Sequence, residues 1–533
     1  MINEFAVLDE RGLQLEIAAR NVVAACREDR YGRGWRPKGI DEVAIVLESL
    51  GYSTEVIAGL WYDSLFVFAA DVSRLVDQYV SDIERDQARD LGWFARSCRD
   101  YALGALYSGP WIAAVIGLSV FGAALWSSLS TPLSIATAIA LGTFGGLIAS
   151  GAVAQIVGRR VAIYQLDDSP ALVSYVLERL LGWSTVAFAV IAFVGWLALR
   201  ATYGDPNAGL AAVFFFASSL FEMSLAPLYA LRRFRSIALV SVVAIATTGL
   251  TFSYGFHRRV SVPLEPAVLA TEIAAIGALV ILGTLRWLRL RGRGGERAKM
   301  APAMRTIMRN TLPYAIFGGC YFGSIVVDHI VAGFTGGGRY RYRSGYELGC
   351  DLALVATIPA IGLINAAMES MPRRILGCAT RGLANIAKFD AEMRDFYLRS
   401  AASVLALTSV TVVAIEFVAP RLLEHAALIS PGPNGGEALF VLRYAALAYG
   451  ILMLGLLNSQ MLFLMSRPRG PLAAAATAVL VNVSVSIVAR LHGMPPEYCV
   501  FGLLAGVVVF AALTSIAAYR MARHFTFHYF AGF

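Results

Sequence analysis

The residues of this 533-residue chain best suited to chemistry are a few carboxylates inside apolar segments. Asp328 follows a stretch rich in glycine and other small residues, which would give a helix a small, wettable face. A charge at the centre of a bilayer costs about 2.5–3.5 kcal/mol or more, so it usually faces a polar cavity or a partner. We therefore expect Asp328 to bind a cation, relay a proton, or contact a sugar or an amine. The alternative is a side chain that only reaches the outer interface.

Other polar groups inside apolar segments are weaker candidates for substrate or ion binding. Glu222 and Asn458 each precede a basic turn by about ten residues. Asp351 and Glu369 would lie at the two ends of one helix, where carboxylates are often simply solvated. Glu416, near the end of another segment, is a further member of this group.

Aromatic residues near the predicted helix ends form a second set of candidates. Trp111, Tyr314, Tyr321 and Tyr346 could stack on sugar rings. Membrane-interface belts are enriched in the same residues, which is the simpler explanation for any single one. An external loop that alternates Arg and Tyr over residues 339–343 would suit an anionic or sugar ligand, a partner protein, or solvent alone.

Neither a metal nor a cofactor is predicted from the spacing of ligands. The six cysteines show no CxxC or related pattern, and no histidine precedes His257. The first hundred residues contain no nucleotide-binding loop. The basic pI of about 9.2 does not indicate nucleic acid, because most arginines lie in short loops between apolar segments.

The elements that must position these residues are apolar runs of about twenty residues. Hydrophobic residues make up 57% of the chain and charged residues only 15%, which excludes an ordinary soluble enzyme. Runs of this length can cross a bilayer core about 30 Å thick. Twelve spans are predicted, near residues 103–126, 133–157, 181–199, 209–231, 236–256, 264–286, 311–334, 347–368, 400–419, 438–464, 471–489 and 498–519.

Basic residues in the loops predict the orientation. With the N-terminus inside, the cytoplasmic loops and tail hold 24 Lys/Arg, counting Arg286 at the end of the sixth span, and the opposite loops hold 8. This bias places both termini in the cytoplasm of a bacterial inner-membrane protein. No signal peptide is expected, because the first hundred residues lack a basic-then-apolar start.

Four regions follow from this pattern. Residues 1–100 hold 12 Lys/Arg against 18 Asp/Glu and are predicted to form an acidic, cytoplasmic helical domain, with helices at Leu13–Cys26, Ile40–Leu50 and Thr54–Arg85. Residues 101–286 form a first six-helix bundle, 287–310 a basic connector, and 311–533 a second bundle with a short tail. The predicted fold is therefore an all-α polytopic membrane protein in two six-helix bundles.

The two bundles carry a faint internal repeat. A proline followed by an aromatic opens the first helix of each, at Pro110-Trp111 and Pro313-Tyr314. Glu222 and Asn458 hold matching places in the fourth helices. Proline-interrupted segments in corresponding positions point to a transporter with a site between its halves.

Several collinear stretches resemble the inner-membrane exporter family of Pel-type exopolysaccharides (PelG). This family belongs to the flippase superfamily (MOP) that includes the multidrug antiporters (MATE). The matching stretches are Tyr107-Ser108-Gly109-Pro110-Trp111, Gln155-Ile156-Val157-Gly158-Arg159-Arg160, the segment Leu228–Ile237, Asp328-His329, and Tyr346 through Asp351 and Ala356-Thr357-Ile358-Pro359-Ala360 to Glu369. His329 stands where the family tends to have Lys, and residues 1–90 are extra.

The resemblance implies export of an exopolysaccharide or its lipid-linked unit by alternating access. It also implies a cytoplasmic glycosyltransferase partner and accessory membrane subunits. Pel-type polymers are partly cationic, which would suit acidic groups in a cavity. The resemblance thus assigns a role in exopolysaccharide export and biofilm formation, without enzymatic activity.

Two other hypotheses remain open from the residues. One is a proton- or sodium-coupled antiporter for drugs or other small molecules. The other is a membrane polysaccharide polymerase or ligase, which would need a sizeable outer loop with catalytic groups. The longest outer loops, near residues 334–346 and 420–437, are only about fifteen residues long by the span limits above.

Overall fold

The computed structural model describes residues 14–19, 21–23, 39–59, 62–88, 93–109, 112, 132–166, 170–258, 264–291, 304–334, 338–379, 386–429 and 435–530. These residues are almost entirely helical, and an isolated bridge between Phe334 and Tyr340 is the β-type pairing among them. The chain divides into two compact units. Unit 1 is Met1–Arg99 with Pro372–Ala384, and unit 2 is Asp100–Met371 with Asn385–Phe533.

In unit 1, short amphipathic helices enclose a small core. The helices are α2 (Ile40–Ser49), α3 (Thr54–Ala58), α4 (Leu65–Ala88) and the start of α5 (Trp93–Ala105). Leu47 and Phe68 are fully buried in this core. The predicted single helix Thr54–Arg85 is wrong, because α4 makes a new start at Leu65, where the Ser64 hydroxyl accepts a hydrogen bond from the Val67 N–H.

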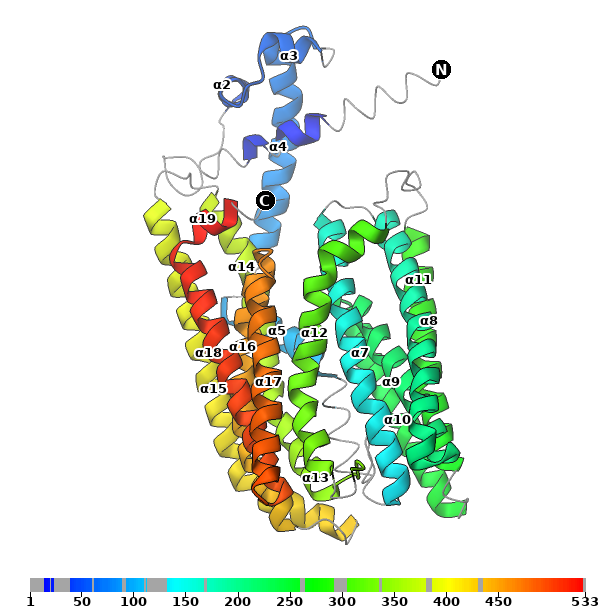
Figure 1. The fold of residues 1–533 in the computed structure, drawn as a ribbon. Coiled ribbons are helices and arrows are strands. Elements are labelled where there is room, and N and C mark those ends of the chain that lie inside the picture. Colours follow the sequence, from blue (N-terminus) through cyan, green and yellow to red (C-terminus); the bar gives the residue numbers. More distant parts are fainter. Residues whose placement is uncertain are drawn as a thin grey trace. The chain divides into compact units, whose positions relative to one another are not determined.

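The first half of unit 2 consists of long apolar helices (Figure 1). They are α7 (Leu133–Leu166), α8 (Pro170–Tyr203), α9 (Asp205–Ala230), α10 (Phe234–Arg258) and α11 (Leu264–Arg291). A short 3₁₀ helix, η1 (Leu106–Ser108), follows α5. Most of the first predicted span, near residues 103–126, lies outside the described residues.

The second half is formed by α12 (Met304–Gly333), α13 (Ser344–Ala353), η3 (Leu354–Thr357), α14 (Ile358–Ala379), α15 (Ile386–Ile429), α16 (Gly435–Leu464), α17 (Arg469–Leu491) and α18 (Val500–Arg523). The 3₁₀ helix η5 (Pro496–Cys499) precedes α18, and α19 (Phe525–Phe530) follows it. In the described part of the chain, ten helices are long and apolar enough to cross a membrane. α10 occupies the place of the fifth predicted span, with a shorter apolar stretch.

One predicted span contains a 3₁₀ turn. The span near 347–368 is confirmed as one helical stretch, Ser344–Met371, in which η3 lies between α13 and α14. Pro359 lies in the first turn of α14 and lacks a backbone N–H, so one α-helical hydrogen bond is missing at this point.

The two halves of unit 2 meet along α7 and α12, which pack closely through glycines. A Cβ on Gly318 would collide with the backbone carbonyl of Gly151, and a Cβ on Gly151 would collide with the ring of Phe322. Small residues at such crossings allow helix backbones in a membrane to approach each other.

Candidate functional site

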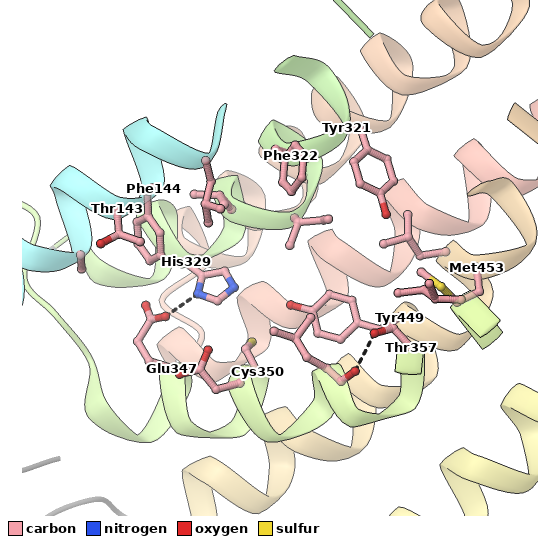
Figure 2. A pocket seen from close by; sticks show the side chains of 18 of the residues that line it. Thr143, Phe144, Tyr321, Phe322, His329, Glu347, Cys350, Thr357, Tyr449 and Met453 are labelled. Atoms are coloured by element: carbon pink, nitrogen blue, oxygen red, sulfur yellow. Dashed lines mark hydrogen bonds and ion pairs between the residues drawn. The ribbon is translucent and has the colours of Figure 1, made fainter. Parts of the chain in front are cut away.

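A cavity of about 140 Å³ lies where α7 of the first half meets α12, α13 and α16 of the second. Figure 2 shows that aromatic and aliphatic side chains make up most of its wall, with a polar group at one side. The main lining residues are Thr143, Phe144, Tyr321, Phe322, His329, Tyr342, Glu347, Cys350, Asp351, Thr357, Tyr449 and Met453. An engineered apolar cavity of about this volume can hold benzene, so the space suits a single-ring organic group.

Asp328 lies directly behind this wall and is fully buried. Its carboxylate accepts a hydrogen bond from the Tyr346 hydroxyl at 2.6 Å and one from the Asn482 side-chain amide at 3.3 Å. The same amide of Asn482 also donates to the Ser324 carbonyl at 2.9 Å. Helices α12, α13 and α17 therefore hold the carboxylate in one place, which excludes the interfacial alternative.

His329 and Glu347 form a second buried contact beside Asp328. The Nδ1 atom of His329 lies 2.6 Å from a carboxylate oxygen of Glu347, and Nε2 lies 3.9 Å from a carboxylate oxygen of Asp328. The imidazole ring also makes edge-on contacts with Phe144 and Tyr346. An imidazole thus lies between two carboxylates in the interior of the protein.

The spacing of residues along α13 explains how this short helix supplies several of these groups. Tyr346 and Cys350 are four residues apart, as are Glu347 and Asp351, so each pair shares one face of the helix. Gly349 lies against α16, where a Cβ would come within 2.7 Å of the Ala438 carbonyl. The close packing of α13 on α16 turns the opposite face towards α12.

Of the predicted site residues, Asp328, Asp351 and Tyr321 are brought together at the cavity. Asp351 and Tyr321 line it, and Asp328 lies behind it. Tyr346, also singled out from the sequence, is fully buried and joins the same network through Asp328.

The remaining predicted residues lie elsewhere in unit 2 or outside the described residues. Tyr314 contacts the Arg159 guanidinium and the Phe463 ring. Asn458 is fully buried and donates to the Ser515 hydroxyl at 2.9 Å. Glu369 also lies away from the cavity, in an ion pair with Arg232 at 2.8 Å. Glu222 is half-buried on α9, away from the cavity as well. Trp111 lies outside the described residues.

Two further carboxylates, one half-exposed and one largely buried, form ordinary ion pairs away from the cavity. Glu416 pairs with Arg443 at 2.8 Å. Arg343, from the predicted basic–aromatic loop, pairs with Glu437 at 3.2 Å. In the same loop, burial holds the pKa of the Tyr340 hydroxyl well above its usual range, with a further contribution from Glu347. This loop is therefore partly packed against the protein.

Sequence reasoning missed Glu347, Cys350 and Asn482. Glu347 and Cys350 lie in the segment assigned to the eighth predicted span, and their closeness to residues 328–329 depends on how α13 packs beside α12. A usable signal was present, since a short segment before Pro359 carries a carboxylate or a thiol at positions 347, 350 and 351. Asn482 is separated from Asp328 by 154 residues, and nothing local in the sequence links them.

Comparison with known proteins gives matches in structure only. No family model matches the chain, and no curated protein matches its sequence. A structure titled as the outward-facing conformation of a multidrug resistance MATE family transporter of the MOP superfamily superposes with a TM-score of 0.52 at 14% identity, covering 80% of this chain and 96% of that one. The corresponding inward-facing structure gives 0.52 at 12% identity, covering 79% and 94%.

A third structure, of MATE in the straight conformation, gives a TM-score of 0.51 at 14% identity and covers 80% of this chain and 94% of that one. Identities this low establish a shared fold and nothing finer. The chain is thus an all-α, polytopic membrane protein whose fold is similar to that of MATE transporters of the MOP superfamily.

Proposed function

We propose that this protein is a membrane transporter that exports small organic cations in exchange for a proton or sodium ion. The observation that carries the proposal is the cavity between the two halves of unit 2, with a wall of aromatic and aliphatic side chains and buried acids at one side. Aromatic faces and carboxylates both attract organic cations. Glu347 and Asp351 in the cavity wall, with Asp328 behind it, would offer negative charge to the substrate or to the coupling ion.

Contacts between the halves occur at both ends of the bundle, and alternating access would open each set in turn. Near the connector between α11 and α12, Arg159 of α7 donates to the Ser466 hydroxyl at 2.5 Å. At the opposite end, the Tyr203 hydroxyl accepts from the Tyr340 N–H at 3.0 Å. Rocking of the halves would break one set of contacts while it keeps the other.

Export of an exopolysaccharide or its lipid-linked unit is the second candidate. The collinear resemblance to the PelG family supports it, and the separate acidic unit 1 offers a surface on which a cytoplasmic glycosyltransferase could dock. The size of the cavity, suited to one ring, favours the small-molecule hypothesis. In both cases the protein would lie in a bacterial inner membrane with both termini in the cytoplasm.

Cells lacking their own drug exporters provide the test. The chain should lower steady-state accumulation of a fluorescent organic cation, and an ionophore that collapses the coupling gradient should abolish this effect. Asp328→Asn should reduce efflux about tenfold or more at equal membrane abundance, because losing a charged partner costs roughly 2 kcal/mol or more.

Glu416→Gln is the control for Asp328→Asn. It alters a half-exposed ion pair away from the cavity and should transport like the wild type.

A strain lacking drug exporters and a strain lacking a Pel-type exporter together separate the two candidates. Unchanged accumulation with the wild-type chain, together with restored polymer secretion in a strain lacking a Pel-type exporter, would reject the small-molecule hypothesis in favour of exopolysaccharide export.

A further inference from the structure

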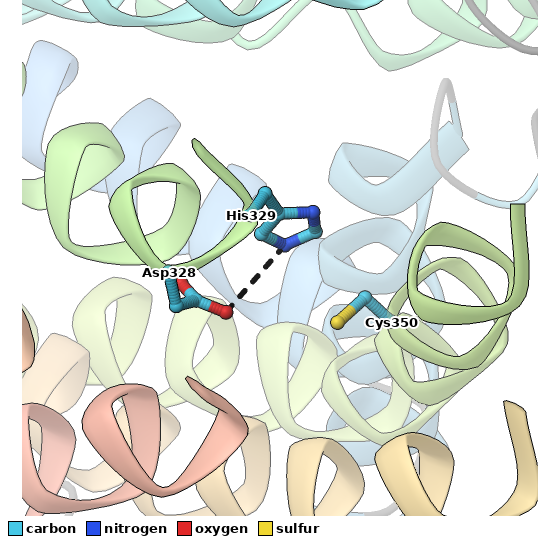
Figure 3. A group of neighbouring side chains, drawn as sticks. All are labelled: Asp328, His329 and Cys350. Atoms are coloured by element: carbon cyan, nitrogen blue, oxygen red, sulfur yellow. Dashed lines mark ion pairs between the residues drawn. The ribbon is translucent and has the colours of Figure 1, made fainter. Parts of the chain in front are cut away.

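Three side chains of different ligand chemistry converge beside the cavity. They are the Asp328 carboxylate, the His329 imidazole and the Cys350 thiol (Figure 3). All three are buried, with 0, 6 and 1% of their surface exposed. One ligand atom from each lies within 4.8 Å of the other two. A sulfur, a nitrogen and an oxygen donor together suit Zn²⁺, whereas Ca²⁺ and Mg²⁺ require oxygen ligands.

The three ligand atoms lie somewhat further apart than in a loaded metal site. Zinc bonds of about 2.0–2.3 Å in a tetrahedron place neighbouring ligand atoms roughly 3.3–3.6 Å apart. The Nε2 atom of His329 is 3.9 Å from the Asp328 carboxylate, and all three atoms lie within 4.8 Å of one another. On metal binding, rotations of these side chains would close the remaining gap.

Glu347 prepares the histidine for this role. Its carboxylate lies 2.6 Å from Nδ1 of His329, so a neutral ring would carry its proton on Nδ1 and direct the lone pair of Nε2 towards Asp328. A carboxylate on the far nitrogen of a metal-binding histidine is a common arrangement that fixes the ring and strengthens it as a ligand. Glu347 would act as a positioning residue.

Charge balance also favours a divalent cation. Zn²⁺ bound to one carboxylate and one thiolate is neutral, which lowers the cost of keeping Asp328 in the interior of a membrane protein. Both His329 and Cys350 line the cavity, whereas Asp328 lies behind them. The fourth position of the metal would therefore face the cavity and could take water or a donor atom of a substrate.

We propose that Asp328, His329 and Cys350 form a zinc-binding site in the wall of the cavity, with Glu347 holding the imidazole. The inference goes beyond the proposed transport function, because metal binding by the purified protein is independent of which substrate is exported. The sequence predicted no such site, because no metal-ligand spacing is present in it. The spacing is absent because the ligands come from two helices joined through an intervening loop.

The test uses the full chain, purified in detergent without a histidine tag and stripped of metal. Calorimetry with Zn²⁺ should give one equivalent bound per chain, and Co²⁺ should produce a thiolate-to-metal charge-transfer absorption. Cys350→Ala should abolish that absorption and His329→Asn should abolish stoichiometric binding. Cys320→Ala, which removes a half-buried thiol on the same α12 helix as His329, should change neither result.

Glu347→Gln provides a graded readout. It should weaken the affinity for Zn²⁺ about 10–100-fold while leaving one site per chain, because only the support of the imidazole is altered. Each variant must first elute as a single folded species. The proposal is overturned if the wild type binds no Zn²⁺, or if one equivalent and the Co²⁺–thiolate absorption both survive Cys350→Ala.

Discussion

The two halves of unit 2 share a type of helix-ending turn but differ in their buried polar side chains. After α9, Arg232 takes a left-handed conformation with φ of 54°, and after α16, Ser466 does so with φ of 57°. In both turns the next residue, Arg233 or Arg467, donates its N–H to the carbonyl five residues earlier at 2.9 Å. The helix ends are therefore built in the same way, as in a helix C-terminus with a left-handed cap.

Each of these turns is held by a helix of the opposite half. The Arg232 guanidinium pairs with Glu369 of α14 at 2.8 Å, and Arg159 of α7 reaches Ser466 after α16. α7 and α14 correspond to the second predicted span of their respective halves. The contacts are thus reciprocal, although one is an ion pair and the other joins a cation to a hydroxyl.

Buried polar groups do not follow this repeat. Asp328, His329, Glu347 and Cys350 all belong to the second half. At the matching places in the fourth helices, Asn458 is fully buried with hydrogen bonds to α18, whereas Glu222 is half-buried on α9. The shared turns thus fix where these helices end, and individual buried side chains decide which half carries the chemistry.

The largest expected effect is a loss of stability from a substitution where α7 packs against α12. Gly318→Ala should destabilise the protein by about 1–3 kcal/mol, because the new Cβ collides with backbone of α7 and the helices must separate. Thermal unfolding followed in detergent measures the change. Gly319→Ala is the matched control, since its Cβ would meet nothing closer than 3.9 Å. Equal melting temperatures for the two variants would show that α7 and α12 do not pack as described.

The fourth helices give an intermediate effect. Asn458→Ala removes a buried amide that donates to Ser515 and should cost about 1 kcal/mol in the free energy of unfolding. Glu222→Gln should change stability by less, because no hydrogen bond of that carboxylate occurs among the described residues. Chemical denaturation of the two variants side by side would show the asymmetry. A larger loss for Glu222→Gln would reverse the comparison.

The reciprocal contacts at the turns give the smallest effect. A double-mutant cycle with Arg232→Ala and Glu369→Ala should yield a coupling of about 0.2–1 kcal/mol, as expected for an ion pair whose Arg232 side chain is 58% exposed. High salt should reduce the coupling further. The charge swap Arg232→Glu with Glu369→Arg should recover part of it. A coupling energy of zero at low salt would show that this contact does not link the two halves.

Much of the fold could be predicted because apolar run length is a local property. The runs from Leu133 onward gave the places of α7 to α12 and α15 to α18, although helices such as α8 extend beyond the predicted limits. Hydrophobicity marks where a helix crosses the lipid, and the helix itself can continue into water. The 3₁₀ turn η3 within the eighth span was not predicted, because its residues are as apolar as those of an ordinary α-helix.

The candidate site could be predicted only in part. Asp328 was identifiable because a carboxylate in an apolar run is costly wherever that run packs. Its partners Tyr346 and Asn482 lie on two other helices, so no local pattern could connect them to it.

The sequence by itself determined that the chain is a helical membrane protein with rare buried acids, because both facts depend only on the transfer of side chains from water to lipid. Tertiary structure alone decided which of those acids share a cavity. The close packing of Gly349 on α16 and the hydrogen bond from Asn482 of α17 help to place Glu347, Cys350 and Asp328 around one imidazole. Such an arrangement follows from helix packing, which periodicity along a single chain does not encode.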